Sequence, residues 1–394
     1  MIEVNTIIAD LAWPIGILLA WFIGELGYRW LKVPHISIYA VVGFILAYPQ
    51  LGLLPQTQPL PILLLANIGF GLILFEAGYR MNLRWMFNNP WVALSSILEA
   101  TLTFILVFYL LKLYGLAFST CLILAALSMA TSPATVIRVI NEQRSSGQVT
   151  ERLLHLSVLN CVWTVFLFKI IVGFAMFHSS ESIGQATYTS LYVLMISTLL
   201  GILFGVVMPL LLRMIKSSCN DNTLPFAIAV ILLVALTYNL KLSPVLATLT
   251  FGMVSRHGRM VFNSSLRGFG TLGDLLSMLL FVFIAATIEW RQVMAGMSVG
   301  LLIIAVRQFA KVAGITVFAH ISGITWKKGF LTGMAMAPMS VFVILILEQS
   351  RYIGINFIDT LAPLAMVALT LEILGPIILQ KALILAHEIP LNKE

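Results

Sequence analysis

Five ionisable side chains lie inside long apolar stretches of the chain. They are Glu99, Lys169, Arg307, Lys311 and Glu372. In a lipid bilayer such a group costs at least ~2.5–3.5 kcal/mol on insertion scales, so it is usually paired or functional. The two carboxylates suit the binding of a cation or a proton, whereas the three bases suit an anion or a charge pair. For any one of these residues taken alone, a buried structural ion pair is the alternative.

Two of the apolar stretches are interrupted by proline together with small and hydroxyl-bearing residues. The first interruption reads Ser128-Met-Ala-Thr-Ser-Pro-Ala-Thr135, and the second reads Gly329-Phe-Leu-Thr-Gly-Met-Ala-Met-Ala-Pro-Met-Ser340. Proline removes a backbone donor and clashes with the preceding turn, so a helix should open at Pro133 and at Pro338. The half-helix ends then offer partial charges and free carbonyl groups to an ion. Two unrelated proline kinks are the alternative.

The composition places these residues in a membrane protein. Of the 394 residues, 60% are hydrophobic and 10% are charged, whereas a soluble domain carries roughly 25% charged residues. Together with a mean hydropathy of +1.01, this excludes a soluble globular protein. The apolar runs are continuous, whereas a transmembrane β-barrel has short segments of alternating hydrophobicity. We therefore predict an all-α polytopic membrane protein.

Apolar runs between charged or Pro-, Gly- and Asn-rich breaks mark thirteen predicted transmembrane helices. They lie at about residues 7–31, 35–54, 61–80, 90–114, 117–142, 151–177, 186–215, 223–240, 243–261, 273–289, 293–320, 328–348 and 357–386. The connections between them are short. We therefore predict a single transmembrane domain over residues 1–394, without a soluble domain.

The basic residues are distributed unevenly over the connections between the predicted spans. Sixteen of the 23 Lys and Arg residues lie in the odd-numbered connections or after the last span, and four lie in the even-numbered connections. Because basic loops stay in the cytoplasm, we predict a cell (inner) membrane protein with an external N-terminus and a cytoplasmic C-terminus. This placement accounts for the net charge of +7, so we expect no nucleic-acid partner.

The two interrupted spans are the fifth and the twelfth, so they cross the membrane in opposite directions. Spans two to six and spans nine to thirteen then form two five-helix inverted repeats, at about residues 35–177 and 243–386. The interrupted helix is the fourth in each repeat. Secondary transporters with a binding site near the bilayer midplane have this arrangement. We therefore predict two broken, crossed helices around such a site.

Several short motifs follow one another in an order that is specific, although each motif alone is modest. They are Leu31-Lys-Val-Pro34, Val42-Gly-Phe-Ile-Leu-Ala47, Leu51-Gly-Leu53, Ile68-Gly-Phe-Gly-Leu-Ile-Leu-Phe-Glu-Ala-Gly78, Ala130-Thr-Ser-Pro-Ala-Thr-Val-Ile-Arg138, Val306-Arg-Gln-Phe-Ala-Lys311 and Gly333-Met-Ala-Met-Ala-Pro-Met-Ser-Val341. Over nearly its whole length the chain resembles the monovalent cation:proton antiporters, the bacterial sodium/proton and potassium/proton exchangers of the second cation:proton antiporter family. The resemblance implies a homodimer whose mobile core binds a monovalent cation, sodium or potassium, and protons.

The sequence departs from that family at the residue pair that carries the ion. The family has an Asn-Asp or Asp-Asp pair in the span after the first broken helix, and the matching residues here are Asn160 and Cys161. A thiol is mostly neutral at pH 7, so Cys161 cannot stand in for a carboxylate. By the resemblance, the ion site would comprise Thr131, Ser132, Asn160 and Cys161. Lys311 matches the family's basic residue and has lost the partner that the family pattern supplies.

Acids from elsewhere must then face Lys311 and Arg307, which lie four residues apart on one helix face and repel each other. Glu99 and Glu372 are the mid-span acids available for this pairing.

Three functions fit these residues. The first is a cation:proton antiporter whose titrating carboxylate is Glu372 or Glu99, with neutral oxygens from Asn160 and Thr131. The second is a transporter of an anion or polar solute that uses the three mid-span bases. The third is a non-transporting sensor or partner subunit. We do not expect an enzyme, because Ser/His/Asp and HExxH spacings are absent, and the three cysteines show no ligand spacing that predicts a metal or cofactor.

Overall fold

The computed structural model describes residues 4–55, 60–177, 183–214, 223–257, 270–340, 343 and 358–390. The regular structure in these ranges is entirely helical. The helices are α1 (Val4–Leu31), α2 (His35–Leu46), α3 (Leu60–Arg80), α4 (Leu83–Asn88), α5 (Pro90–Leu113), α6 (Phe118–Ser128), α7 (Pro133–Gln143), α8 (Gln148–Phe177), α9 (Ile183–Met214), α10 (Thr223–Asn239), α11 (Pro244–His257), α12 (Gly270–Ala286), α13 (Trp290–Ala295), α14 (Met297–Val317), α15 (Trp326–Ala335) and α17 (Ile358–Leu385).

The prediction of an all-α polytopic membrane protein is confirmed. Within the described ranges, seven helical stretches are long and apolar enough to cross a membrane, and three further apolar helices are shorter. Each of the thirteen predicted spans overlaps at least one helix. The number of membrane crossings and the inverted repeat stay predictions.

The second predicted span was too long at its C-terminal end. It was placed at residues 35–54, whereas α2 ends at Leu46 and a turn follows. Pro49 disfavours helical geometry at the residue before it, and Gly52 adopts a positive φ of 70°. The short helices α4 and α13, which lie just before α5 and α14, were not predicted.

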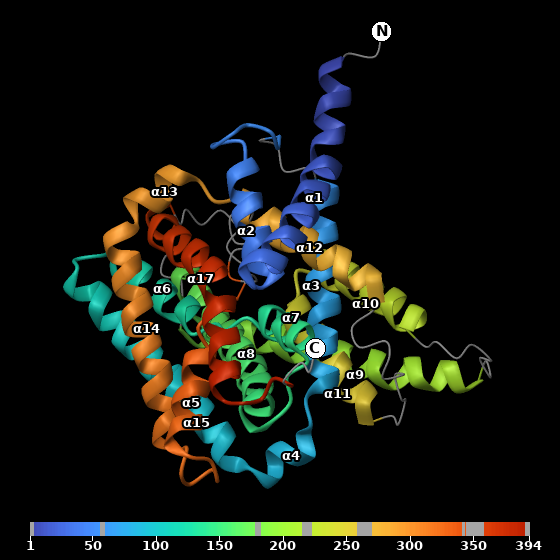
Figure 1. Ribbon diagram of the computed structural model, residues 1–394. Coiled ribbons are helices and arrows are strands. Elements are labelled where there is room, and N and C mark those ends of the chain that lie inside the picture. Colours follow the sequence, from blue (N-terminus) through green and yellow to red (C-terminus); the bar gives the residue numbers. More distant parts are fainter. Residues whose placement is uncertain are drawn as a thin grey trace.

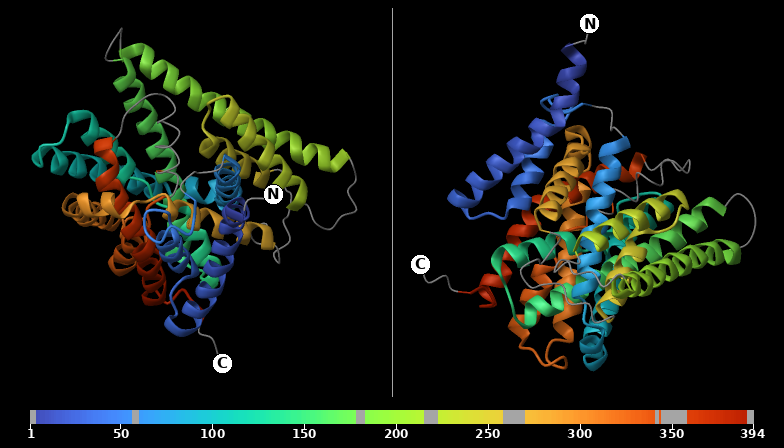
Figure 2. Two further views of the ribbon diagram at one scale, coloured as in Figure 1. Left: turned by 90° about the horizontal axis from the view of Figure 1, so that it is seen from above. Right: turned by 90° about the vertical axis from the view of Figure 1, so that its right-hand side faces the viewer.

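The helices form groups on either side of a central layer. Figure 1 shows α9, α10 and α11 on one side of the molecule and α5, α14 and α15 on the other, with α7 and α8 between them. In the two views of Figure 2, the long helix α9 lies at the edge of the molecule. Its exposed apolar side chains, among them Leu191, Leu199 and Leu203, suit contact with lipid.

The two interrupted helices cross at their breaks. α6 ends at Ser128 and α7 begins at Pro133, while α15 ends at Ala335 and residues 336–340 are not helical. The N–H of Ser132 donates to the carbonyl oxygen of Pro338 at 3.1 Å, so the two segments are bonded directly. Beyond Ser340, the predicted twelfth span lies outside the described residues except for Val343.

Two glycines allow helices to approach this crossing closely. A Cβ atom at Gly314 of α14 would lie 2.6 Å from the Cα of Glu99 on α5. A Cβ atom at Gly375 of α17 would lie 2.7 Å from the Cα of Pro338. Because a real Cβ atom cannot come this near, the backbones of α14 and α17 reach the site only through glycine.

The charge asymmetry generates a test of orientation. We expect a cysteine at Ser146, which is exposed in the connection carrying Arg144, to face the cytoplasm. A cysteine at the exposed Ala117 should face the outside. In intact cells, an impermeant thiol reagent should label Ala117→Cys and spare Ser146→Cys until the membrane is permeabilised. The opposite labelling pattern would show that the assignment is inverted.

Candidate functional site

Arg307 lies at the centre of the crossing, and its hydrogen bonds go to backbone carbonyl groups of both interrupted helices. The guanidinium donates to the oxygens of Ser128, Ala130 and Ala337 at 2.8 Å each, and to that of Pro338 at 3.4 Å. The side chain is fully buried. These carbonyls lose their helical partners where the helices open, so the arginine satisfies them and neutralises the negative ends of α6 and α15.

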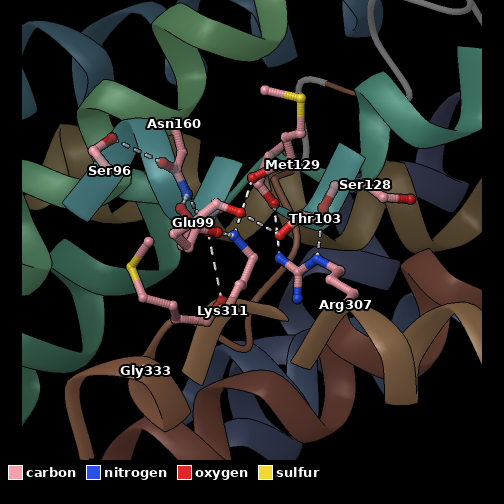
Figure 3. Close-up of polar contacts among 12 residues, drawn as sticks. Ser96, Glu99, Thr103, Ser128, Met129, Asn160, Arg307, Lys311 and Gly333 are labelled. Atoms are coloured by element: carbon pink, nitrogen blue, oxygen red, sulfur yellow. Dashed lines mark hydrogen bonds and ion pairs between the residues drawn. The ribbon is translucent and has the colours of Figure 1, made fainter. Parts of the chain in front are cut away.

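Lys311 lies one turn further along α14 and forms an ion pair with Glu99 of α5. Its Nζ contacts Glu99 Oε1 and donates to the carbonyl oxygen of Met129 at 3.1 Å (Figure 3). Both side chains are 0% exposed. Gly314 lies three residues after Lys311 on the same helical face, and its missing side chain brings α5 close enough for the pair to form.

Asn160 of α8 joins this pair to the first unwound segment. Its Nδ2 donates to Glu99 Oε2 at 2.9 Å and to Thr131 Oγ1 at 3.3 Å, while its Oδ1 accepts from Ser96 at 3.3 Å. Figure 3 shows Asn160 and Lys311 on different sides of the Glu99 carboxylate. Both oxygens of Glu99 are therefore bound, one by a charge and one by an amide.

Cys161 is buried next to Asn160 and contacts both unwound segments. Its Sγ donates to the carbonyl oxygen of Thr131 at 3.4 Å and lies 3.9 Å from the hydroxyl of Ser340. A thiol acts here as a weak donor between the two segments.

The start of α8 is fixed by the C-terminal part of the chain. Glu388 accepts hydrogen bonds from the backbone N–H groups of Val149 and Thr150 at 2.8 Å each. A carboxylate at a helix N-terminus satisfies free donors and opposes the positive end of the helix dipole. This contact anchors the helix that carries Asn160 and Cys161.

The structure brings together most of the residues predicted for the site, but not all of them. Thr131, Asn160, Cys161, Glu99, Arg307 and Lys311 form one connected cluster, and Ser132 lies at the bonded crossing. Lys169 is half-buried on α8, nine residues and therefore about 13 Å beyond Asn160 along the helix. Glu372 is 7% exposed on α17, and its Oε1 accepts no hydrogen bond from the part of the chain that the structure describes.

One expectation about the bases was wrong, and two neighbours were missed. Arg307 was expected to face an acid, but its hydrogen bonds go to carbonyl groups, since unwound backbone offers several acceptors at once. Ser96 and Thr103 were not predicted; the hydroxyl of Thr103 donates to the carbonyl oxygen of Glu99 at 2.8 Å. Their spacing of three and four residues from Glu99 on one helix was the available signal.

A helical membrane protein whose two interrupted helices cross at a buried ion pair belongs to the class of secondary transporters. More particularly, the chain belongs to the sodium/hydrogen exchanger family, because the family model "Sodium/hydrogen exchanger, transmembrane" matches residues 15–384. The predicted membership in a cation:proton antiporter family is confirmed. No curated protein sequence matches the chain.

Two solved structures of the sodium proton antiporter MjNhaP1 from Methanocaldococcus jannaschii have a similar fold. The structure at pH 8 is 18% identical in sequence and covers 96% of each chain, with a TM-score of 0.70. The structure from an electron microscopy map is also 18% identical. The match covers 99% of this chain and 100% of the antiporter chain, with a TM-score of 0.73. At this identity the likeness concerns the fold.

The carbonyl contacts of Arg307 generate a prediction for stability. Arg307→Met leaves the carbonyls at the crossing without donors, and each unsatisfied buried acceptor costs ~1–3 kcal/mol. We expect a clearly lower melting temperature in detergent, whereas Lys327→Met, at an exposed cation, should leave it unchanged. Arg307→Lys should fall between them because an ammonium lacks the planar fork. Equal melting temperatures for Arg307→Met and the unsubstituted chain would contradict this role.

Proposed function

We propose that the chain exchanges a monovalent cation, sodium or potassium, for protons, and that Glu99 is the carboxylate that binds the cation. The observation that carries this proposal is the buried pair of Glu99 and Lys311 at the crossing of two interrupted helices. Membership in the sodium/hydrogen exchanger family supports the reaction. In this proposal the ion-binding acid is Glu99 on α5, because the position on α8 where the related antiporters carry a carboxylate holds Cys161.

The exchange follows from competition for one carboxylate. A cation that binds Glu99 displaces the ammonium group of Lys311, which then has no anionic partner in a dry site and releases its proton. When Lys311 takes up a proton again, it returns to Glu99 and expels the cation. The carboxylate therefore holds either the cation or the ammonium group, and this exclusion couples the two movements.

Neutral oxygens near Glu99 complete the proposed cation site. The amide oxygen of Asn160, the hydroxyl of Thr131 and the carbonyl oxygen of Thr131 lie within the same cluster. Sodium and potassium bind hard oxygen ligands, and the C-terminal ends of half-helices supply them in secondary transporters. Ser132 contributes indirectly, because its side chain accepts from the Thr135 N–H at 3.2 Å and so caps α7.

The arrangement argues against the anion alternative. The donors of Arg307 are directed at carbonyl groups, and Lys311 is directed at Glu99 and Met129. An anion would have to displace these partners. Lys169 lies too far along α8 to join the other two bases.

The proposal includes an overall organisation. Residues 1–394 form one transmembrane domain with inverted repeats at about 35–177 and 243–386. The packing of α5 against α14, the third helix of each repeat, supports this symmetry. The transporter works as a homodimer in the cell membrane with a cytoplasmic C-terminus, as the charge distribution favours.

Two matched substitutions identify the coupling acid. Glu99→Gln removes the charge that binds both the cation and Lys311, so we expect cation-driven proton efflux from proteoliposomes to fall at least ~10-fold. Glu372→Gln should keep most of the exchange, because within the described residues no hydrogen bond or ion pair joins Glu372 to the cluster. Loss in Glu372→Gln with full activity in Glu99→Gln would move the role to α17. A response to chloride instead of cations would favour the anion transporter, and no response at all would favour a non-transporting subunit.

Restoring a carboxylate at Cys161 tests the relocation directly. Cys161→Asp places a second anion beside Asn160, and nearby Lys311 and Arg307 offset part of its burial. We expect a folded protein with altered sodium-to-potassium selectivity or pH dependence of exchange. Cys161→Asn, which is neutral, should leave both unchanged. Identical behaviour of the Asp and Asn variants would contradict a carboxylate-based ion site at this crossing.

A further inference from the structure

The amide nitrogen of Asn160 occupies oxygens that the cation needs in the proposed exchange. Nδ2 lies 2.9 Å from Glu99 Oε2 and 3.3 Å from Thr131 Oγ1. A carboxylate only accepts hydrogen bonds, so the NH2 group must face Glu99, and the amide oxygen must point away from it. The amide therefore has to move before a cation can bind these oxygens.

A half-turn of the Asn160 amide about its Cβ–Cγ bond would remove this obstacle. The rotation withdraws Nδ2 from Glu99 Oε2 and from Thr131 Oγ1, and it brings Oδ1 to the place that Nδ2 leaves. The two orientations of an asparagine amide have nearly the same shape, and this torsion is broad and roughly two-fold. One movement of one side chain thus turns three oxygens toward the cation.

Ser96 is placed to satisfy the far side of the amide in both orientations. Its Oγ lies 3.3 Å from Asn160 Oδ1, and Figure 3 shows it on the side of the amide away from Glu99. Both Ser96 and Asn160 are 0% exposed. The Ser96 hydroxyl donates to Oδ1 in this structure. After the half-turn it can accept from Nδ2, while its own proton turns to a carbonyl group one turn earlier in the helix.

Two other buried hydroxyl groups of α5 flank Glu99, and both are bonded within their own helix. Ser95 donates to the carbonyl oxygen of Val92 at 2.8 Å, and Thr103 donates to that of Glu99 at 2.8 Å. The bond from Ser96 goes to α8 instead, and at 3.3 Å it is longer than these two. Ser96 is therefore the hydroxyl of this group that can change its hydrogen-bonding role with the orientation of Asn160.

We propose that Ser96 is a positioning residue, which lets the Asn160 amide turn over when the cation replaces Lys311 at Glu99. With Lys311 at the carboxylate, the amide donates to Glu99 and accepts from Ser96. With the cation at the carboxylate, the amide oxygen faces the cation and the amide nitrogen donates to Ser96. The second arrangement is the stronger one, because an amide polarised by a charge donates more strongly. This inference rests on the proposed function, since it names the residue that makes room for the cation.

The rotation is tested by infrared difference spectroscopy of the full chain in lipid membranes. The buffer is exchanged between choline chloride and sodium or potassium chloride at constant ionic strength, and 13C-asparagine identifies the side-chain amide band. Coordination of a cation lowers the C=O stretching frequency, so we expect a cation-dependent shift that is absent from Asn160→Ala. Ser96→Ala should lose most of the shift, because the turned amide nitrogen then has no acceptor. Ser96→Thr keeps a hydroxyl and should retain the shift.

Cation-driven proton efflux from proteoliposomes gives the matching functional measurement. We expect Ser96→Ala to raise the apparent KM for the cation at least ~5-fold and to keep the maximal rate within ~2-fold, because it weakens the cation-bound state. Ser96→Thr should restore the KM. Ser95→Ala is the control, since it removes the neighbouring buried hydroxyl, which is bonded to Val92. Its KM and its amide band should match those of the unsubstituted chain.

The outcomes separate this inference from the proposed function. An amide band that does not respond to cations, in a chain that still exchanges them for protons, overturns the rotation and leaves the exchange standing. A full band shift in Ser96→Ala, or an equally raised KM in Ser95→Ala, overturns the role of Ser96. A band shift that depends on Ser96, without proton efflux in any variant, supports the rotation and contradicts the exchange. Neither a band shift nor efflux contradicts both.

Discussion

Unwound backbone inside a membrane must find hydrogen-bond partners within the protein, and this constraint shapes the rest of the structure. No water is available in the hydrocarbon region, so each free carbonyl group needs a donor. Arg307 supplies donors to both interrupted helices, and Ser132 bonds one segment to the other. The crossing is therefore a single polar unit, and the surrounding helices are arranged to bury it.

The same arrangement resolves the charge balance of the site. Two bases and one acid would leave an excess positive charge if each base needed a carboxylate. Arg307 instead faces the negative ends of two half-helices, so Lys311 is the one of these two bases that pairs with Glu99. A pair held by one carboxylate is open to exchange, because a single cation can replace the ammonium group. Two bases on one face of α14 thus do different things. Arg307 holds the unwound backbone, whereas Lys311 is the base that we propose takes part in transport.

Much of this organisation could be predicted from residue types and spacing. Continuous apolar runs predicted the helices, and the prolines with their hydroxyl neighbours predicted the two interruptions. Both signals are local, since they depend on the cost of burying backbone and charge in lipid and on the geometry of proline. The buried bases Arg307 and Lys311 stood out for the same reason. Helix ends were less certain: the turn at Pro49 ended α2 earlier than the apolar run suggested.

The sequence by itself determined that Glu99, Glu372, Lys169, Arg307 and Lys311 needed partners, because each lies in an apolar run. Only the tertiary structure decided which partners they have. Glu99 and Lys311 are 212 residues apart and meet because Gly314 brings α14 against α5. Glu372 has equally apolar neighbours in the sequence, yet within the described residues its Oε1 accepts no hydrogen bond from the cluster. Which face of a helix meets which neighbour depends on packing between distant segments, and hydrophobic periodicity in a membrane span carries little of that information.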